Sequence, residues 1–280
     1  MNLRHNRLRF IAIGLIILAL VGINSVIAEE GFEIHFLDVG QADAVVVLCD
    51  GQSLMIDGGN VKDSSLVYSY LQNTLNLNHL DYMIATHPHE DHVGGLVGAL
   101  NSCTVGTVFS PCLEYESKAF NSFLKYVHEQ GWEISIPAVG QTFFLGSASV
   151  QFLSPAREYA GINDNSIVVR IVYGNTSFLF TGDAEWDAEH DMVDAGFDLE
   201  STLLKVGHHG SNSSSSYVFL RAVAPRYAVI SVGVGNQYGH PAEDTLSRLH
   251  DSGAEVYRTD QRGNIICASD GDTLTVTFEK

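Results

Sequence analysis

Several strand-like apolar runs in this chain lead directly into aspartate or histidine, and this pattern constrains the fold more than any other feature. SLMID ends in Asp57, LDYMIA leads into a block that begins at His87, FLFTGD ends in Asp183, and LLKVGHH ends in paired histidines. Runs of this length that are rich in aliphatic and aromatic residues are typical of buried strands. The pattern therefore predicts an α/β protein in which several strand ends converge on shared chemistry.

The composition supports a folded chain with a buried core. The 280 residues are 45% hydrophobic and 17% charged, which excludes a disordered or low-complexity protein. The formal net charge of −18 excludes a stable coat on nucleic acid, because such binding requires lysine and arginine to displace counterions from phosphates. The same charge disfavours adhesion to anionic lipid, so contact with nucleic acid or membrane would have to be local.

The N-terminus has the pattern of a targeting segment. Three arginines precede an apolar run at 10–23, which is shorter than the roughly 20 residues that span a bilayer. We expect residues 1–28 to be a signal peptide cleaved after Ala28, or an uncleaved signal anchor that contacts the membrane through residues 10–28. Either outcome makes the protein secreted or extracytoplasmic, with residues 29–280 as the exported domain.

The exported part alternates between strand-like and helical patterns, without a linker or a repeat. Antiparallel runs with interspersed helices occur in both halves, which predicts two sheets face to face with helices outside, a four-layer αββα sandwich. The four cysteines lack CxxC spacing, and either a Cys103–Cys112 disulfide or four buried thiols is compatible with them. We expect strands at 32–39, 43–49, 53–57, 80–85, 105–109, 142–145, 148–153, 166–173, 176–181, 202–206, 227–232, 254–258, 264–268 and 273–278, and helices at 63–76, 92–101, 117–130, 184–195, 214–223 and 242–252.

The segment THPHEDHVGG, at residues 86–95, gathers three histidines and an aspartate within six residues. Imidazole and carboxylate together suit zinc, or manganese and iron where carboxylates contribute more. His87 and His89, two apart on extended backbone, can chelate one ion, while Asp91 and His92 can reach a second ion beside it. The alternative is a chance cluster of exposed histidines, but the following glycines indicate close backbone packing that such a cluster would not need.

Two later segments add the same kinds of group at strand ends. FLFTGD ends in Asp183, which a strand terminus could hold between two cations, as in two-metal hydrolases. LLKVGHHGS carries His208 and His209, and we expect one of them to complete the second metal site while the other bonds nearby or meets substrate. Each segment alone has an ordinary explanation, as a turn aspartate or a structural histidine pair. Together with the first block they favour one metal centre.

Further polar residues are candidates for supporting roles. We expect Asp57 to orient a ligand imidazole, with an ordinary turn aspartate as the alternative. His240, in the loop NQYGHP, could bind a phosphate or carboxylate of the substrate or help to expel the leaving group, and a plain surface histidine is the alternative. Ser211 and Asn212, followed by the serine run at 213–216, are candidate phosphate contacts, but the run could equally be a flexible loop and a helix N-cap.

Taken together, these motifs resemble the metallo-β-lactamase fold superfamily, whose HxHxDH motif is matched in full by residues 87–92. A narrower similarity, to the soluble domain of ComEC-type competence proteins of DNA-uptake channels, rests on FLDVGQADAVVV, MIDGG, NDNSIVVRIVYGNTSFLFTGDAE, LKVGHHGSNSSSS and ISVGVGNQYGHP. The resemblance runs from about residue 31 to the C-terminus. It implies the four-layer sandwich and a metal-dependent nuclease, and we expect a free-standing, exported relative without the channel portion.

The resemblance also assigns ligands. It implies a first site at His87 and His89, a second site at Asp91, His92 and one of the later paired histidines, and Asp183 between the two sites. It favours His209 over His208, because the family's last histidine commonly precedes a small residue. Residues 160–171 contain no histidine for the first site, so Asn163 and Asn165 become candidate oxygen ligands, which would favour manganese over zinc.

We therefore expect a hydrolase that uses two divalent metal ions, zinc or manganese, to activate water for attack on a small-molecule or oligonucleotide phosphodiester. Asp91 would hold the nucleophile and accept its proton, and His240 would assist at the leaving group. The alternatives are hydrolysis of carboxylic esters, lactones or β-lactams, release of phosphocholine, and a catalytically inactive binding module with the same fold. Nothing in the sequence indicates an oligomeric state.

Overall fold

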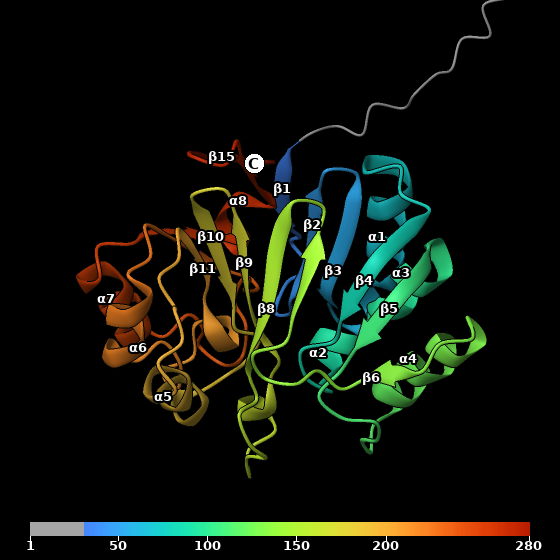
Figure 1. The fold of residues 1–280 in the computed structure, drawn as a ribbon, viewed down its shortest axis with the longest axis horizontal. Helices are drawn as coiled ribbons and strands as arrows, with labels where there is room; N and C mark the ends of the chain where they lie inside the picture. Colours follow the sequence, from blue (N-terminus) through green and yellow to red (C-terminus); the bar gives the residue numbers. More distant parts are fainter. Residues whose placement is uncertain (1–30) are drawn as a thin grey trace, which may run out of the picture.

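The computed structural model describes residues 31–280, which form two mixed β-sheets lying face to face (Figure 1). Within these residues the first sheet has the strand order β15 (Leu274–Phe278), β14 (Ile265–Ser269), β1 (Phe32–Phe36), β2 (Ala44–Cys49), β3 (Gln52–Gly58), β4 (His79–Ile84), β5 (Thr104–Phe109) and β6 (Ile134–Ser135). The second sheet has the order β13 (Glu255–Arg258), β12 (Tyr227–Ile230), β11 (Leu203–Lys205), β10 (Thr176–Phe180), β9 (Val168–Tyr173), β8 (Ala148–Ser154) and β7 (Thr142–Leu145).

Helices cover the outer face of each sheet, so the predicted four-layer αββα architecture is confirmed (Figure 1). The helices against the first sheet are α1 (Ser64–Ser69), α3 (Leu96–Ser102) and α4 (Lys118–Glu129). Those against the second sheet are α5 (Trp186–Asp194), α6 (Tyr217–Val223) and α7 (Glu243–Asp251). The short elements are α2 (Glu90–Val93), α8 (Thr259–Arg262), η1 (Val61–Asp63), η2 (Tyr70–Thr74), η3 (Asn163–Asn165) and η4 (Gly207–Gly210).

The core between the sheets follows from the alternation of side chains along each strand. Phe32 and Phe36 of β1 point inward and stack against Phe178 and Phe180 of β10, with ring centroids 4.6 Å and 6.1 Å apart. Leu179, between the two phenylalanines of β10, packs instead against the outer helices. Since successive side chains of a strand face opposite sides, each apolar strand joins two layers of the core at once.

The site lies where parallel strands of both sheets end. Strands β3 and β4 pair in parallel in the first sheet, and β10, β11 and β12 pair in parallel in the second. Parallel strands bring their carboxyl ends to one edge, and loops at that edge commonly carry the functional groups. Helix α2, which carries part of the histidine block, lies at the lower end of the strands in Figure 1, between the two helical layers.

Most expected elements are present, and the differences have local causes. The helix expected at 92–101 is two helices, α2 and α3, separated by Gly94 and Gly95. A Cβ atom on Gly95 would overlap the carbonyl oxygen of Gly58, so the chain turns here to pack backbone against backbone. The helix expected at 214–223 begins only at Tyr217, because the Ser216 hydroxyl accepts from Phe219 N as an N-cap.

Other differences are small. The helix expected at 63–76 begins earlier and is divided among η1, α1 and η2, and strand β6 and helix α8 were not predicted. The four cysteines are free thiols, so the Cys103–Cys112 disulfide is not formed. In the described residues no helix combines the length and the apolar character that a membrane crossing requires. The predicted targeting segment, residues 1–28, lies outside the described residues.

Candidate metal centre

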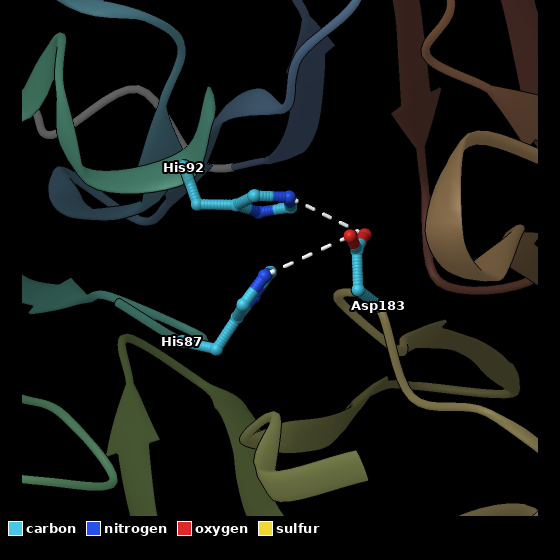
Figure 2. Close-up of side chains that lie close together, drawn as sticks. All are labelled: His87, His92 and Asp183. Carbon is cyan, nitrogen blue, oxygen red and sulfur yellow. Dashed lines mark ion pairs between the residues drawn. The ribbon is translucent and has the colours of Figure 1, made fainter. Parts of the chain in front are cut away.

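The carboxylate of Asp183, just after β10, lies at the centre of a buried cluster of histidines. Figure 2 shows the imidazoles of His87 and His92 pointing at this carboxylate, with His92 Nε2 3.3 Å from Oδ1 and His87 Nε2 3.7 Å from Oδ2. His209 Nε2 is 3.7 Å from Oδ1, and His208 Nε2 is 3.8 Å from Oδ2. Each oxygen of the one carboxylate therefore faces two imidazole nitrogens.

The histidine block after β4 supplies the facing groups in two sets. His87 Nε2 lies 3.0 Å from His89 Nδ1, so these two imidazoles converge on one point. Asp91 and His92 lie at the start of α2, where the His92 ring is 4.1 Å from that of His87 between centroids and Asp91 Oδ2 lies 3.3 Å from His209 Nε2. The spacing of the block thus contributes to two neighbouring groups of donor atoms, which share His92.

Asp57, at the end of β3, holds the block in place. Its Oδ1 accepts from the backbone N–H of Thr86 at 2.8 Å, and its Oδ2 accepts from the Thr86 hydroxyl at 2.7 Å. The same Oδ2 lies 2.8 Å from Nδ1 of His92. This bond leaves His92 Nε2 facing Asp183, which is the geometry expected for a carboxylate that orients a ligand imidazole.

The paired histidines after β11 both adopt the left-handed backbone conformation, with φ of 48° for His208 and 52° for His209, and both turn Nε2 toward the Asp183 carboxylate. The buried His209 ring has Nδ1 3.1 Å from the carbonyl oxygen of Ser231. His208 has Nδ1 3.0 Å from Glu185 Oε1, which also accepts from the Ser213 hydroxyl at 2.6 Å. Non-glycine residues in this strained conformation are commonly found at functional sites.

Two residues that the sequence patterns did not single out belong to the same cluster. Asp43, just before β2, has Oδ1 3.3 Å from His209 Nδ1 and Oδ2 2.6 Å from the ammonium nitrogen of Lys205. Lys205 is 2% exposed, which is rare for lysine. A lone lysine within the apolar run at 202–206 was the available signal, but no pattern in the sequence named its partner.

A cavity of about 360 Å³ opens over the cluster. His240 lies at its wall, with Nδ1 3.4 Å from the Gln41 side-chain nitrogen, and Tyr238 stacks on its ring. Burial, together with His208 and His209, lowers the pKa of His240 to about 4. The lining residues are Gln41, His89, Glu90, Asp91, Asn163, Asp183, His208, His209, Tyr238 and His240.

Besides the buried His87, His92 and Asp57, three further sequence candidates do not line this cavity. Asn165 was a candidate oxygen ligand, but its carboxamide bonds the backbone of Tyr159 and Gly161. Ser211 is buried and its hydroxyl lies 2.9 Å from that of Ser213, and Asn212 is exposed outside the cavity. Asn163, in contrast, faces His208, with Nδ2 3.5 Å from its ring nitrogens.

The electrostatics of the cluster favour positive charge at its centre. Burial disfavours charge on His92 and His209, but the surrounding carboxylates, Asp183 first, outweigh it and raise both pKa values, to about 10 for His209. Burial opposes ionisation of Asp183 as well, yet the charges of His92 and His209 hold its pKa well below the ordinary value. For Asp91 the same balance lowers the pKa to about 2. The carboxylates stay ionised and favour a cation, a proton or a metal, at the imidazoles.

The donor atoms themselves fit divalent metal ions. His92 Nε2, His209 Nε2 and Asp183 Oδ1 are buried and form no hydrogen bond with any described residue, which would be costly if nothing were to bind there. Histidine and carboxylate atoms form compact groups within 4.8 Å, among them His87, His92 and Asp183 in one group and Asp91, His92 and His209 in another. Two such groups that share residues are consistent with a di-metal site.

Comparison with known proteins agrees with this geometry. The family model described as "Metallo-beta-lactamase superfamily" matches residues 37–234. The chain is 32% identical over 240 residues to "Competence protein ComA" of Neisseria gonorrhoeae, covering 85% of this chain and 32% of that protein. It is 29% identical over 257 residues to "ComE operon protein 3" of Bacillus subtilis (strain 168), covering 85% and 33%. The chain thus spans about a third of the length of these relatives.

Solved structures share the fold. The chain is similar to CmlA, a diiron beta-hydroxylase from Streptomyces venezuelae, with a TM-score of 0.54 and 16% identity over 82% of this chain and 53% of that one. It is also similar to the metallo-beta-lactamase fold protein YhfI from Bacillus subtilis, with a TM-score of 0.52 and 15% identity over 81% and 96%. At these identities the similarity concerns the fold alone.

Proposed function

The chain belongs to the metallo-beta-lactamase superfamily, and on this premise we propose that it is a metal-dependent hydrolase that cleaves phosphodiesters. The coarser part of the proposal, a hydrolase with a di-metal site, rests on the fold and on the buried histidine and aspartate groups. The finer part, the phosphodiester, rests on the relatives named as competence proteins.

The observation that carries the proposal is that the two oxygens of Asp183 face two separate sets of imidazoles. A first cation would be held by His87, His89 and Asp183, with Asn163 and His208 facing the same side. A second cation would be held by Asp91, His92, His209 and Asp183. Zinc suits the imidazole-rich donors, and manganese becomes competitive if Asn163 contributes its buried, unpartnered oxygen.

When bound, the pair of divalent cations lowers the pKa of water and neutralises negative charge on the attacked phosphate. The residues of the chain do the rest. Asp91 lines the cavity and is held ionised, so its carboxylate can accept a hydrogen bond from the attacking water and hold it in place. Asp57 keeps His92 fixed on the second site, and Glu185 keeps His208 turned toward the cavity. His240 stands at the wall, where it can bond to the substrate or its leaving group.

The cavity wall indicates how the substrate is held. In the described part of the chain its lining includes neutral donors, Gln41, Asn163 and Tyr238, but no lysine or arginine. The charge of a phosphodiester would therefore be met by the cations, while the amides and the phenol bond its oxygens. The acidic chain repels long polyanions, so we propose a small phosphodiester or a short oligonucleotide as the substrate.

An inactive binding module is the less favoured reading. A module that no longer bound metal would leave atoms of Asp183, His92 and His209 buried without a partner among the described residues, which is costly. We further propose that the domain works outside the cytoplasm, on the basis of the basic and apolar start of the sequence.

The proposal is tested by assaying the purified protein with bis(p-nitrophenyl) phosphate, short single-stranded DNA and a chromogenic β-lactam, each with zinc or manganese. We expect turnover of the first two substrates and none of the third. Turnover of the β-lactam alone would replace the phosphodiester with a carboxylic substrate. Absence of any turnover in a protein that binds two equivalents of metal would support the binding module.

A further inference from the structure

We propose that Asp43 is a positioning residue for His209, and that the buried ammonium of Lys205 is the counter-charge that holds this carboxylate in place. The proposal rests on the metal centre described above. It adds a residue that acts on the second site through a ligand, from the side opposite to the cavity.

The backbone of Asp43 is fixed from both sides by the loops of the centre. Its N–H donates to the carbonyl oxygen of Asp91 at 3.1 Å, and its own carbonyl oxygen accepts from Gly59 N at 2.7 Å. Asp91 belongs to the histidine block, and Gly59 lies two residues after Asp57, which holds that block in place. Asp43 therefore starts from a defined position relative to the second site.

The side chain of Asp43 reaches the rear nitrogen of His209. Oδ1 lies 3.3 Å from Nδ1, and the Ser231 carbonyl oxygen lies 3.1 Å from the same nitrogen. The opposite nitrogen, Nε2, faces Asp91 and Asp183. The Ser231 carbonyl oxygen can fix the orientation of the His209 ring. A carboxylate near the same nitrogen also makes the imidazole a stronger electron-pair donor to a metal ion.

Lys205 explains how another carboxylate can be buried beside this centre. Its ammonium nitrogen lies 2.6 Å from Asp43 Oδ2 and donates to the Val206 carbonyl oxygen at 2.8 Å. Both side chains of the pair are almost fully buried. Because a buried charge is costly unless it is paired and hydrogen-bonded, the ammonium offsets the cost of Asp43. Lys205 comes from β11 and Asp43 precedes β2, so the pair also joins the two sheets at the site.

Direct binding of a cation by Asp43 is the competing explanation. Asp43, Asp183 and His209 each offer an atom within 4.8 Å of the others. Asp43 Oδ1 is also buried without a hydrogen bond to a described residue, as a ligand atom would be. The arrangement nevertheless favours positioning, because Oδ2 is engaged by Lys205 and Oδ1 lies 3.3 Å from Nδ1, the His209 nitrogen that is opposite the one facing Asp91 and Asp183. A residue that acts through His209 should lose its effect once that imidazole is removed, whereas a direct ligand should not.

The experiment is a double-mutant cycle of Asp43→Asn and His209→Ala with Lys205 in place, because Lys205 is the residue that holds the Asp43 carboxylate. Four proteins are compared: the wild type, Asp43→Asn, His209→Ala and the double variant. The probe is Co²⁺ added to the metal-free protein, and the readouts are the affinities and the visible absorption spectra of both equivalents. The equivalent that His209→Ala weakens marks the second site. Asp43→Asn combined with Lys205→Met, which removes both charges of the pair, replaces Asp43→Asn if the single variant does not fold.

We expect Asp43→Asn to weaken the Co²⁺ equivalent bound at the second site by about 10- to 100-fold and to change its spectrum, while the equivalent at the first site keeps its affinity. In the His209→Ala background, Asp43→Asn should change that affinity less than about threefold. If Asp43→Asn weakened Co²⁺ binding equally with and without His209, Asp43 would be a direct ligand and the proposal would be overturned. If Asp43→Asn left the Co²⁺ affinity unchanged in the protein that retains His209, Asp43 would be only a structural partner of Lys205.

Glu189→Gln is the matched control. This buried carboxylate accepts from the backbone N–H groups of Ser215 and Ser216 and touches no imidazole, so its loss should leave Co²⁺ binding unchanged. Because the cycle measures metal binding and not turnover, its outcome is independent of the substrate. Failure of the phosphodiester assay would leave the positioning result standing, and failure of the cycle would leave the hydrolase proposal intact.

Discussion

Asp183 is the residue on which both halves of the metal centre depend, since its two oxygens face different imidazoles. An amide in its place has one oxygen and no charge. We expect Asp183→Asn to abolish turnover and to lower the bound metal from two equivalents to one or none, with the fold intact. Elemental analysis after controlled reloading, with circular dichroism as the check on folding, measures this.

His89→Ala is the informative comparison for Asp183→Asn. His89 approaches His87 and lines the cavity, so its loss should abolish turnover and weaken one equivalent of metal while the other remains. If either variant bound two equivalents of metal and kept wild-type turnover, the residue changed in that variant would not be part of the metal centre.

Glu189, which is not a metal ligand, makes the stability of the folded protein depend on pH. Burial raises its pKa to about 7 from the ordinary 4.5, although two backbone donors and Arg248 favour the charged form. Between these values the unfolded chain has released the proton and the folded chain has kept it, so the stability falls as the pH rises from about 4.5 to about 7. The full effect, present above that range, is of the order of 3 kcal/mol.

Glu189→Gln removes this titration. We expect the unfolding free energy of the variant, measured by denaturant titration, to gain roughly 3 kcal/mol relative to wild type between pH 4.5 and pH 8, whatever its absolute level. Glu243→Gln, which removes an exposed carboxylate, is the control for the loss of a glutamate as such. If the difference in unfolding free energy between Glu189→Gln and wild type stayed constant from pH 4.5 to pH 8, Glu189 would be ionised in the folded protein over that whole range.

At the scale of secondary structure, the turn between α2 and α3 sets the position of the histidine block. Gly95 has an ordinary helical φ of −82°, so alanine would be acceptable to the backbone itself. A Cβ atom there would nevertheless overlap the carbonyl of Gly58, next to Asp57. The glycine is therefore required by close approach between two loops, and both loops carry residues of the site.

Gly95→Ala should consequently destabilise the protein by about 1–3 kcal/mol, which corresponds to a fall in the thermal midpoint of several degrees. The displaced Asp57 should also weaken metal binding. Gly161→Ala is the control, because its Cβ would meet nothing closer than 3.8 Å. Equal thermal midpoints for the two alanine variants would show that the loop can shift at no cost.

Elements with strong local patterns follow the sequence closely. The helix expected at 117–130 is found as α4, capped by Ser117 and buried through Phe120, Phe123 and Val127 on one face. The helix expected at 92–101 is interrupted, because Gly94 and Gly95 pack against the backbone of a loop that is distant in sequence. The local pattern of residues 92–101 gives no sign of that contact.

For the whole molecule, the metal centre joins the two sheets. The block at 87–92 follows a strand of the first sheet, whereas Asp183 and His209 follow strands of the second. Bound cations would therefore hold the sheets together at one edge, in addition to the apolar layer between them. Ligands that bind only the folded state stabilise it by mass action.

We accordingly expect the thermal midpoint to rise with metal concentration. At a free concentration about 100 times the dissociation constant, each site adds about 2.7 kcal/mol, which corresponds to a rise of several degrees. Scanning calorimetry in zinc, in manganese and after chelation measures the effect, and Asp183→Asn should abolish most of it. A midpoint that is independent of metal would mean that the centre does not bridge the folded sheets.

The sequence by itself determined which residue types could bind a metal, that they cluster at residues 87–92, and the sandwich fold. These features are local: periodicity follows from neighbouring residues, and the spacing at 87–92 brings its side chains together once the backbone there is extended and then helical. Only the tertiary structure decided which residues face the centre. Asp43 and His209 meet across more than 160 positions and between two sheets, whereas Ser211 and Asn165 turn aside to bond their own neighbours. Side-chain direction depends on packing between layers, and that packing is not contained in any single segment.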